Sequence, residues 1–216
     1  MAIWNLKQFD KIRDSVAFDF FLRILACACV GFFAVNLSAA YHADKSRITL
    51  LAAIFSETAT IIVLLISRRP KVRDWHWLSV FATIYASFLT LPLITVTNVY
   101  HFLPDNLAII IQSVALLWII NAKITIGRSF GLLPADRGII DTGVYKFVRH
   151  PIYLGYGLLH VGFLFSNFNV QNTLVYVSLY IAQIYRILME EKILMKVPSY
   201  QIYAAKVPYR LIYGIY

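Results

Sequence analysis

The stretch His150–Tyr185 has the sequence HPIYLGYGLLHVGFLFSNFNVQNTLVYVSLYIAQIY, 36 residues without an Asp, Glu, Lys or Arg. A helix needs about 20 mostly apolar residues to cross a bilayer, so this stretch is long enough for two short spans. The polar patch SNFNVQN at 166–172 lies in its middle and is typical of a turn. The sequence therefore predicts a membrane-spanning helical hairpin over 151–166 and 171–189.

The rest of the chain shares this apolar character. Hydrophobic residues make up 60% of the 216 residues and charged residues 14%, against about 45–50% and about 25% in soluble domains. This composition excludes a soluble enzyme, a disordered chain and a secreted disulfide scaffold. Windows with few charged residues predict four further spans, near 23–43, 48–67, 76–99 and 105–126. We therefore expect an all-α integral membrane protein with about six transmembrane helices, the last two forming the hairpin.

Charge is distributed unevenly: 20 Lys and Arg stand against 11 Asp and Glu, for a net charge of +9. In a soluble protein this excess would suggest nucleic acid, but in a membrane protein basic residues collect on the cytoplasmic side. Eighteen of the 20 lie in the two termini, in loop 67–75 and in the loop counted from Lys123 to 150; the opposite side has only Lys45 and Arg47. We expect a multi-pass protein with both termini cytoplasmic, in a bacterial inner membrane or the endoplasmic reticulum depending on the source, and no nucleic-acid partner.

The chain is predicted to form a single membrane domain, 1–216, with two unlike halves. Residues 1–122 hold four plain apolar spans. Residues 123–216 hold eight of the nine glycines and the long loop 123–150, and loops longer than about 12–15 residues are usually functional. The sequence has no P-loop, zinc-protease or serine-hydrolase motif, and no metal site is expected. Any chemistry is therefore expected in the second half.

Two polar clusters are expected to meet at one end of the hairpin. Arg149 and His150 directly precede Pro151, and proline fits the first turn of a helix, whose N-terminus favours an anion. At the far end of the hairpin, Arg186 and Glu190 stand four residues apart and share a helix face. Because both ends of a hairpin return to the same membrane surface, the sequence predicts a site there with cationic and anionic groups.

These clusters belong to a longer pattern. The segment 143–155, GVYKFVRHPIYLG, is followed by Glu190-Glu191 and then by Tyr200, Tyr203 and Val207-Pro208. The pattern resembles the isoprenylcysteine carboxyl methyltransferase family, in a wider group that includes membrane phospholipid methyltransferases, and covers roughly Gly127–Tyr209. The resemblance implies an integral membrane methyltransferase that depends on S-adenosyl-L-methionine and acts on a lipophilic small molecule or lipidated acceptor.

The resemblance also implies roles for individual residues. The implied cofactor-binding residues are Arg137, Gly138, Ile139, Ile140, Tyr145, His150, Pro151, Tyr153 and Glu190. Arg186 corresponds to a substrate-contacting arginine and is the candidate catalytic residue. Two positions depart from the family pattern: Arg137 stands where members often have His or Lys, and Val197-Pro198-Ser199 replaces a segment that usually contains Phe-Gly.

Arg186 favours a carboxylate acceptor, as in O-methylation of a prenylated cysteine, because a guanidinium holds an anion and repels an ammonium group. The lipophilic body would enter between the spans of 1–122, and the cofactor from the cytoplasm. Three alternatives remain: N-methylation of a phospholipid or amine, an NADPH-dependent membrane sterol or lipid reductase, and a small transporter or scaffold. The sequence does not define the acceptor or the oligomeric state.

Glu57 is the other candidate substrate-binding residue. It stands in the middle of a predicted span, where a carboxylate is costly unless it has a partner or a function. Two interpretations stay open: Glu57 lines the acceptor cavity, or it pairs with another buried polar group.

Overall fold

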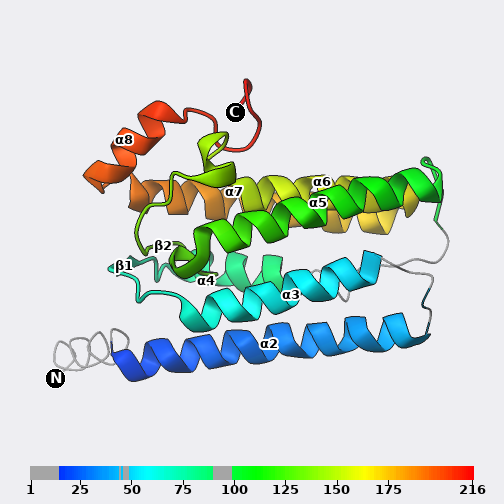
Figure 1. Ribbon diagram of the computed structural model, residues 1–216, viewed down its shortest axis with the longest axis horizontal. Helices are drawn as coiled ribbons and strands as arrows, with labels where there is room; N and C mark the ends of the chain where they lie inside the picture. The colour runs from blue at the N-terminus through cyan, green and yellow to red at the C-terminus, as the bar shows by residue number, and fades with distance from the viewer. Residues whose placement is uncertain (1–14, 44, 46–48, 90–98) are drawn as a thin grey trace.

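The computed structural model describes residues 15–43, 45, 49–89 and 99–216, and this part of the chain is mostly helical. Long helices run side by side along the molecule (Figure 1). The helices are α2 (Val16–Ala43), α3 (Thr49–Ile66), α4 (Trp77–Ile84), α5 (Asp105–Ile126), α6 (Pro151–Ser166), α7 (Val170–Leu194) and α8 (Pro198–Lys206). The shorter elements are the π-helix η1 (Tyr85–Leu89), the 3-10 turns η3 (Gly127–Ser129) and η4 (Gly143–Lys146), and the strands β1 (Val72–Arg73) and β2 (Ala135–Asp136).

Each predicted span overlaps a helix in the part of the chain that the structure describes, although α4 and η1 cover only 77–89 of the predicted span 76–99. Helices α3, α5 and α6 match the predicted spans 48–67, 105–126 and 151–166 to within one residue at each end. Helix α2 begins earlier than its predicted span, because the Oγ of Ser15 accepts the N–H of Phe18 (3.1 Å) and caps the first turn. Helix α7 continues past the predicted 189 to Leu194. Hydropathy marks the apolar segment, whereas backbone hydrogen bonding decides where a helix ends.

Two helices, Val16–Ala43 and Asn106–Ser129, are long and apolar enough to cross a membrane, by length and composition. The other described helices that match predicted spans do not pass that test by themselves. Residues 90–98 of the predicted span 76–99 lie outside the described residues, as do the basic residues of 1–14. The all-helical membrane character is therefore supported, while the six spans and the orientation of the termini stay predictions.

Helices α5 and α6 pack closely along their length. A Cβ added to Gly155 of α6 would lie 2.5 Å from Cγ1 of Ile119 on α5, so this position requires a glycine. The indole N–H of Trp118 donates to the carbonyl of Pro151 (2.9 Å) and ties α5 to the start of α6. Small residues allow such close approach of helices in membranes.

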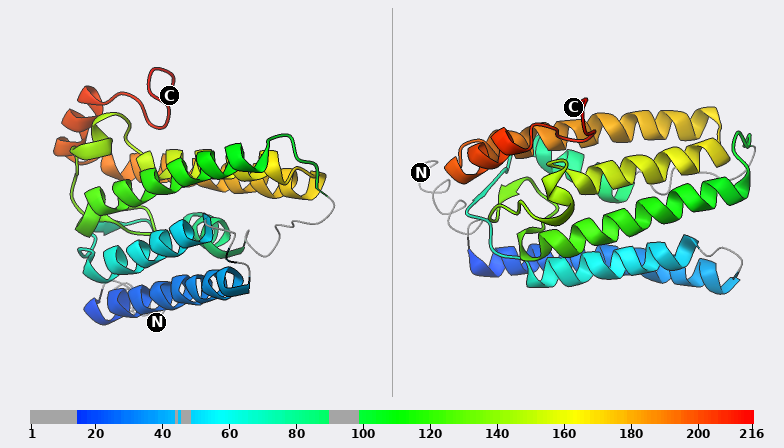
Figure 2. Two further views of the ribbon diagram at one scale, coloured as in Figure 1. Left: turned by 45° about the vertical axis from the view of Figure 1, so that its right-hand side comes forward. Right: turned by 45° about the horizontal axis from the view of Figure 1, so that its top comes forward.

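The two ends of the bundle differ. At one end, the predicted turn between α6 and α7 is confirmed: Asn169 caps α7 by accepting the N–H of Asn172 (2.7 Å), and Phe168 pairs with Tyr100 ahead of α5. At the other end lie α8 and a two-stranded antiparallel sheet of β1 and β2 (Figures 1 and 2). The sequence did not predict this sheet, because each strand has only two residues. It joins the loop after α3 to the loop after α5, beside which the candidate site lies.

Candidate active site

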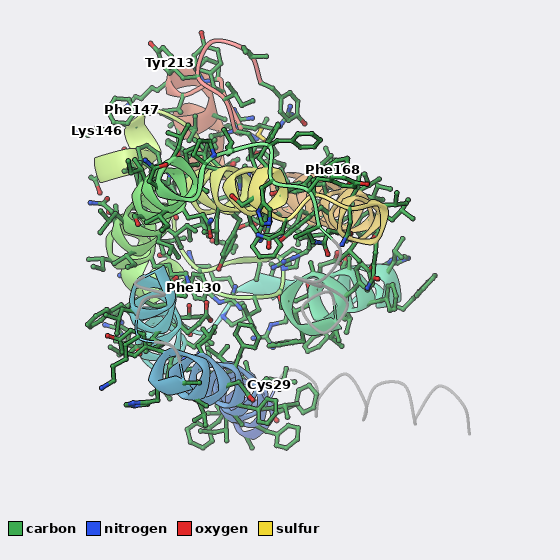
Figure 3. The ribbon with its side chains drawn as sticks, turned by 90° about the vertical axis from the view of Figure 1, so that its right-hand side faces the viewer. Cys29, Phe130, Lys146, Phe147, Phe168 and Tyr213 are labelled. Atoms are coloured by element: carbon green, nitrogen blue, oxygen red, sulfur yellow. The ribbon has the colours of Figure 1, made fainter. Side chains whose placement is uncertain are left out.

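A cavity of about 1200 Å³ lies between the helices and is lined by residues of α2, α3, η1, α5, α6, α7, α8 and the loops between α5 and α6. Figure 3 looks along the helices and shows Phe130, a lining residue, between α2 and α3 on one side and α5 to α7 on the other. The lining includes ten of the eleven candidate residues, namely Glu57, Arg137, Gly138, Ile139, Ile140, Tyr145, His150, Tyr153, Arg186 and Glu190. The eleventh, Pro151, is buried as the first residue of α6.

Arg186 is held on the cavity wall with hydrogen-bonding capacity to spare. Its Nη1 donates to Oε1 of Gln183 (2.9 Å), and its Nη2 donates to the carbonyl of Leu132 (2.8 Å). Its Nε is buried and has no hydrogen-bond partner within the described residues. The guanidinium lies 5.5 Å from the ring centre of Tyr153. Since an arginine carries five N–H groups, two of them position the side chain, and further N–H groups on Nη1 and Nη2 remain.

Glu190 lies one turn further along α7 and also lines the cavity. Its Oε2 accepts a long hydrogen bond from the hydroxyl of Tyr153 (3.5 Å). The described part of the chain shows no ion pair between Glu190 and Arg186, although they share the wall. The Glu190 carboxylate therefore keeps acceptor capacity for an ammonium or hydroxyl group of a ligand.

The loop after β2 presents Arg137 to the cavity. Oδ1 of Asp136 accepts the N–H of Gly138 (3.0 Å), and Gly138 has a φ of +97°, which favours glycine. The Arg137 guanidinium packs so closely on Gly131 that any side chain at position 131 would overlap it. Burial, and next the charge of Arg73, lower the pKa of Arg137 to about 10. Arg137 therefore remains a buried cation at neutral pH. Together, Arg137, Tyr153, Arg186 and Glu190 form what we call the cavity wall.

Tyr145 joins the cavity lining to the C-terminal helix. It is buried in an apolar cluster with Tyr203 and Leu194, against which Ile139 and Ile140 pack. The hydroxyl of Tyr203 donates to the carbonyl of Tyr145 (2.7 Å). Burial, followed by the charge of Glu190, raises the pKa of the Tyr145 hydroxyl above its usual range. These residues shape an apolar part of the site and hold α8 against it.

Glu191 has a different environment from its neighbour Glu190. Its Oε1 accepts hydrogen bonds from Nε of Arg149 (2.9 Å) and from the hydroxyl of Tyr200 (2.6 Å), and it lies 2.9 Å from Nε2 of His150. Its Oε2 accepts from Nη2 of Arg149 (3.1 Å) and lies 3.5 Å from Nε of Arg210. Burial alone would raise the pKa of Glu191, but these donors outweigh burial and lower it to about 2. We call Glu191 with these four partners the Glu191 cluster.

Arg149 extends this cluster to the C-terminal tail. Its Nη1 donates to the carbonyls of Val207 (3.0 Å) and Pro208 (3.2 Å), just after α8. The backbone N–H groups of Arg149 and His150 donate to the carbonyls of Tyr209 and Arg210, both at 2.9 Å. The tail therefore occupies backbone donors just ahead of α6. His150 has one ring nitrogen in the Glu191 cluster while it still lines the cavity.

The position of Lys123 differs from the one assumed in the count of basic residues on the cytoplasmic side. It was counted with the cytoplasmic loop, but it lies inside α5 and is fully buried. Its Nζ donates to the carbonyl and Oγ of Ser56 (3.1 and 2.9 Å) and to Oγ1 of Thr60 (2.6 Å), both on α3. Lys123 is therefore a structural link between two helices and not a surface charge that sets topology.

Sequence reasoning missed the structural roles of Glu191, Tyr200, Arg210 and Lys123. Glu191 could have been separated from Glu190, because adjacent helical residues point about 100° apart, so that only Glu190 shares a face with Arg186. Lys123 carried a weaker signal, as a lone cation within the last turn of a predicted span. The partners of Glu191 carried no local signal, since they come from distant segments.

Comparison with known families agrees with this geometry. Residues 106–196, from α5 through most of α7 and beyond it, match the isoprenylcysteine carboxyl methyltransferase (ICMT) family. This match supports a membrane methyltransferase. This segment is similar to the ICMT family, which confirms the resemblance seen in the sequence. A comparison with curated proteins finds no match to the chain.

Proposed function

We propose that the protein transfers a methyl group from S-adenosyl-L-methionine to a lipophilic acceptor, and that the methylated group is a carboxylate. The observation that supports this most directly is the cavity itself. It combines charged residues, including Arg137, Arg186 and Glu190, with apolar lining from the α2 residues Phe32 and Phe33. Such a cavity suits a water-soluble methyl donor and a hydrophobic acceptor that must meet.

The residues on the cavity wall fit this cofactor. S-adenosyl-L-methionine, when bound, supplies an electrophilic methyl group on a sulfonium. Glu190, with acceptor capacity left by its long bond to Tyr153, would hold the ammonium or the ribose hydroxyls of the cofactor. Arg137 and His150 line the same cavity and would hold its carboxylate.

Arg186 would bind and orient the acceptor. A carboxylate is already ionised at neutral pH, so it needs no general base. It needs a cation that holds it in line with the methyl group, and the Arg186 guanidinium lines the cavity. Gln183 and Leu132 restrict the guanidinium to one orientation. The apolar lining excludes the water that would compete as a nucleophile.

The route of each ligand follows from the proposed topology. With both termini and the β1–β2 end facing the cytoplasm, the cofactor would enter from the cytoplasm. The acceptor would enter from the bilayer between the spans of 1–122. Residues 123–216 would then form the cofactor-binding half of a single membrane domain.

A ligand-stabilisation measurement tests the proposal. We expect S-adenosyl-L-methionine and S-adenosylhomocysteine to raise the Tm of detergent-purified protein, and NADPH to leave it unchanged. Stabilisation by NADPH alone would instead support a reductase. Methyl transfer to prenylcysteine, isoprenoid acids and aminophospholipids should then be compared, with activity expected on acids. Transfer to amines only would overturn the assignment of a carboxylate acceptor.

A further inference from the structure

Polar side chains outside the cavity wall also line the cavity. Glu57 of α3, Gln112 of α5 and Tyr156 of α6 all line it. In the part of the chain that the structure describes, none of these three side chains has a hydrogen-bond partner, although Lys123 acts on Glu57 electrostatically. Three helices thus contribute polar groups to a cavity inside the predicted membrane region.

The neighbouring Lys123 does not serve as the hydrogen-bond partner of the Glu57 carboxylate. The Nζ of Lys123 makes three hydrogen bonds, all to Ser56 and Thr60, and an ammonium group has three donors. Its Nζ also lies 5.6 Å from the ring centre of Tyr156. Lys123 therefore links α3, α5 and α6. All three of its N–H donors are bonded to Ser56 and Thr60, so none is left for the Glu57 carboxylate.

A polar group left without a partner inside a protein costs about 1–3 kcal/mol, and a group in a membrane span has little bulk water to compensate for this. Polar residues within spans accordingly face cavities and mark sites that bind something. Glu57 lies beside Ser56, which bonds Lys123, and Lys123 lies over Tyr156. Along α6, Tyr156 and His160 stand about 5 and about 10 Å inward from Tyr153, at 1.5 Å per residue.

We infer that the methyl acceptor carries a hydrogen-bond donor, such as a hydroxyl or an amide N–H, on its hydrophobic body. This donor would lie about 5–10 Å from the atom that is methylated, and the Glu57 carboxylate would accept its hydrogen bond, with Gln112 and Tyr156 beside it. The inference rests on the proposed function and narrows the class of acceptor. A plain hydrocarbon chain would leave these groups unsatisfied.

The test compares two lipid acids of equal chain length, one plain and one with a hydroxyl about 5–10 Å from the carboxylate. For the unmodified protein, we expect kcat/KM for the hydroxylated acid to exceed that of the plain acid by roughly 5- to 10-fold, the value of one hydrogen bond. The same preference should appear as a larger rise in Tm when each acid is added with S-adenosylhomocysteine present. Equal use of both acids, or a preference for the plain one, would overturn the inference.

Variants at Glu57 test whether this residue causes the preference for the hydroxylated acid. Glu57→Leu should abolish the preference by lowering activity on the hydroxylated acid only, whereas the matched variant Glu57→Gln should keep most of it. An equal loss on both acids in a protein with unchanged Tm would show that Glu57 has no role in selecting the acceptor. If Glu57→Leu does not fold, Gln112→Leu and the acid pair on the unmodified protein decide the question.

Binding of S-adenosylhomocysteine separates this inference from the proposed function. If the protein binds no S-adenosylhomocysteine, the proposed function fails. If it binds this ligand and methylates lipid acids without regard to the hydroxyl, only the present inference fails.

Discussion

The Glu191 cluster and the cavity wall are built from the same kinds of side chain but differ in how fully their carboxylates are paired. In the cluster, the Glu191 carboxylate is bonded by Arg149 and Tyr200 and contacted by His150 and Arg210. On the wall, the Glu190 carboxylate has a single long hydrogen bond, from the hydroxyl of Tyr153. Saturated polar groups stabilise the fold, whereas unsaturated ones in a cavity remain able to bind a ligand.

The two carboxylates are neighbours in the chain, which makes the comparison sharp. Glu190 and Glu191 differ by one position on α7, and therefore by about 100° around the helix. One side chain reaches the cavity and the other reaches the start of α6 and α8. Substitutions at these two positions should separate binding from stability.

The largest effect is expected for Glu191→Gln. It leaves the buried Arg149 without its counter-charge, which should cost about 3–5 kcal/mol of folding stability and lower the Tm by roughly 10 °C. Thermal unfolding of detergent-purified protein measures this. Glu190→Gln is the matched control and should leave the Tm of the ligand-free protein unchanged. An equal loss of Tm in the two variants would contradict the distinction between the Glu191 cluster and the cavity wall.

Arg186→Ala is expected to act on turnover. Losing the cation that holds the acceptor should lower kcat/KM by about 100-fold or more, as for other groups that stabilise charge at a reacting centre. Affinity for S-adenosylhomocysteine, measured by calorimetry, should stay the same. The exposed cation Lys146, substituted by alanine, is the control and should retain activity. Normal turnover by Arg186→Ala would show that its assigned role is wrong.

Glu190→Gln should weaken cofactor binding. A hydrogen bond to a charged group contributes about 1.5–3 kcal/mol, so the Kd for S-adenosylhomocysteine should rise by at least roughly 10-fold. Titration calorimetry at one salt concentration gives the value. An unchanged Kd would show that the cofactor does not contact Glu190, and would contradict the proposed role of this residue of the cavity wall.

Gly131→Ala should have a smaller effect through Arg137. The added methyl group overlaps the Arg137 guanidinium, which must move within the cavity. We expect a loss of about 1 kcal/mol in S-adenosylhomocysteine binding, a roughly fivefold rise in Kd. Gly157→Ala is a suitable control, because its Cβ would lie at an ordinary 3.7 Å from the hydroxyl of Tyr180. Similar effects from both variants would argue against a specific role for the Arg137 contact.

The smallest effect at ordinary pH concerns the protonation of Glu191. Its folded-state pKa of about 2 lies below the usual value for glutamate, so its contribution to stability is complete above about pH 4.5 and is lost as the pH falls toward 2. The Tm difference between the unmodified protein and Glu191→Gln should therefore stay constant from pH 7 to about pH 5 and shrink below it. A difference that grows on acidification would contradict this pKa shift.

Much of the architecture was predictable because helix formation in a membrane depends on local apolar length. The predicted helices 105–126 and 151–166 agree with the structure to the residue, and the resemblance to the ICMT family located nine residues that line one cavity. The β1–β2 sheet and the burial of Lys123 were not predictable in this way. Two-residue strands leave no pattern, and the hydrogen-bond partners of Lys123 are more than 60 residues away in the chain.

The sequence by itself determined a helical membrane protein with a segment similar to the ICMT family, because apolar length, charge and the 143–155 motif are local properties. Only the tertiary structure decided which polar groups are paired and which face the cavity. Glu191 takes its partners from α6, α8 and the tail, and Glu57 shares its cavity with residues of α5 and α6. Hydrogen bonding of a buried group depends on contacts between distant segments, and these exist only once the helices have packed.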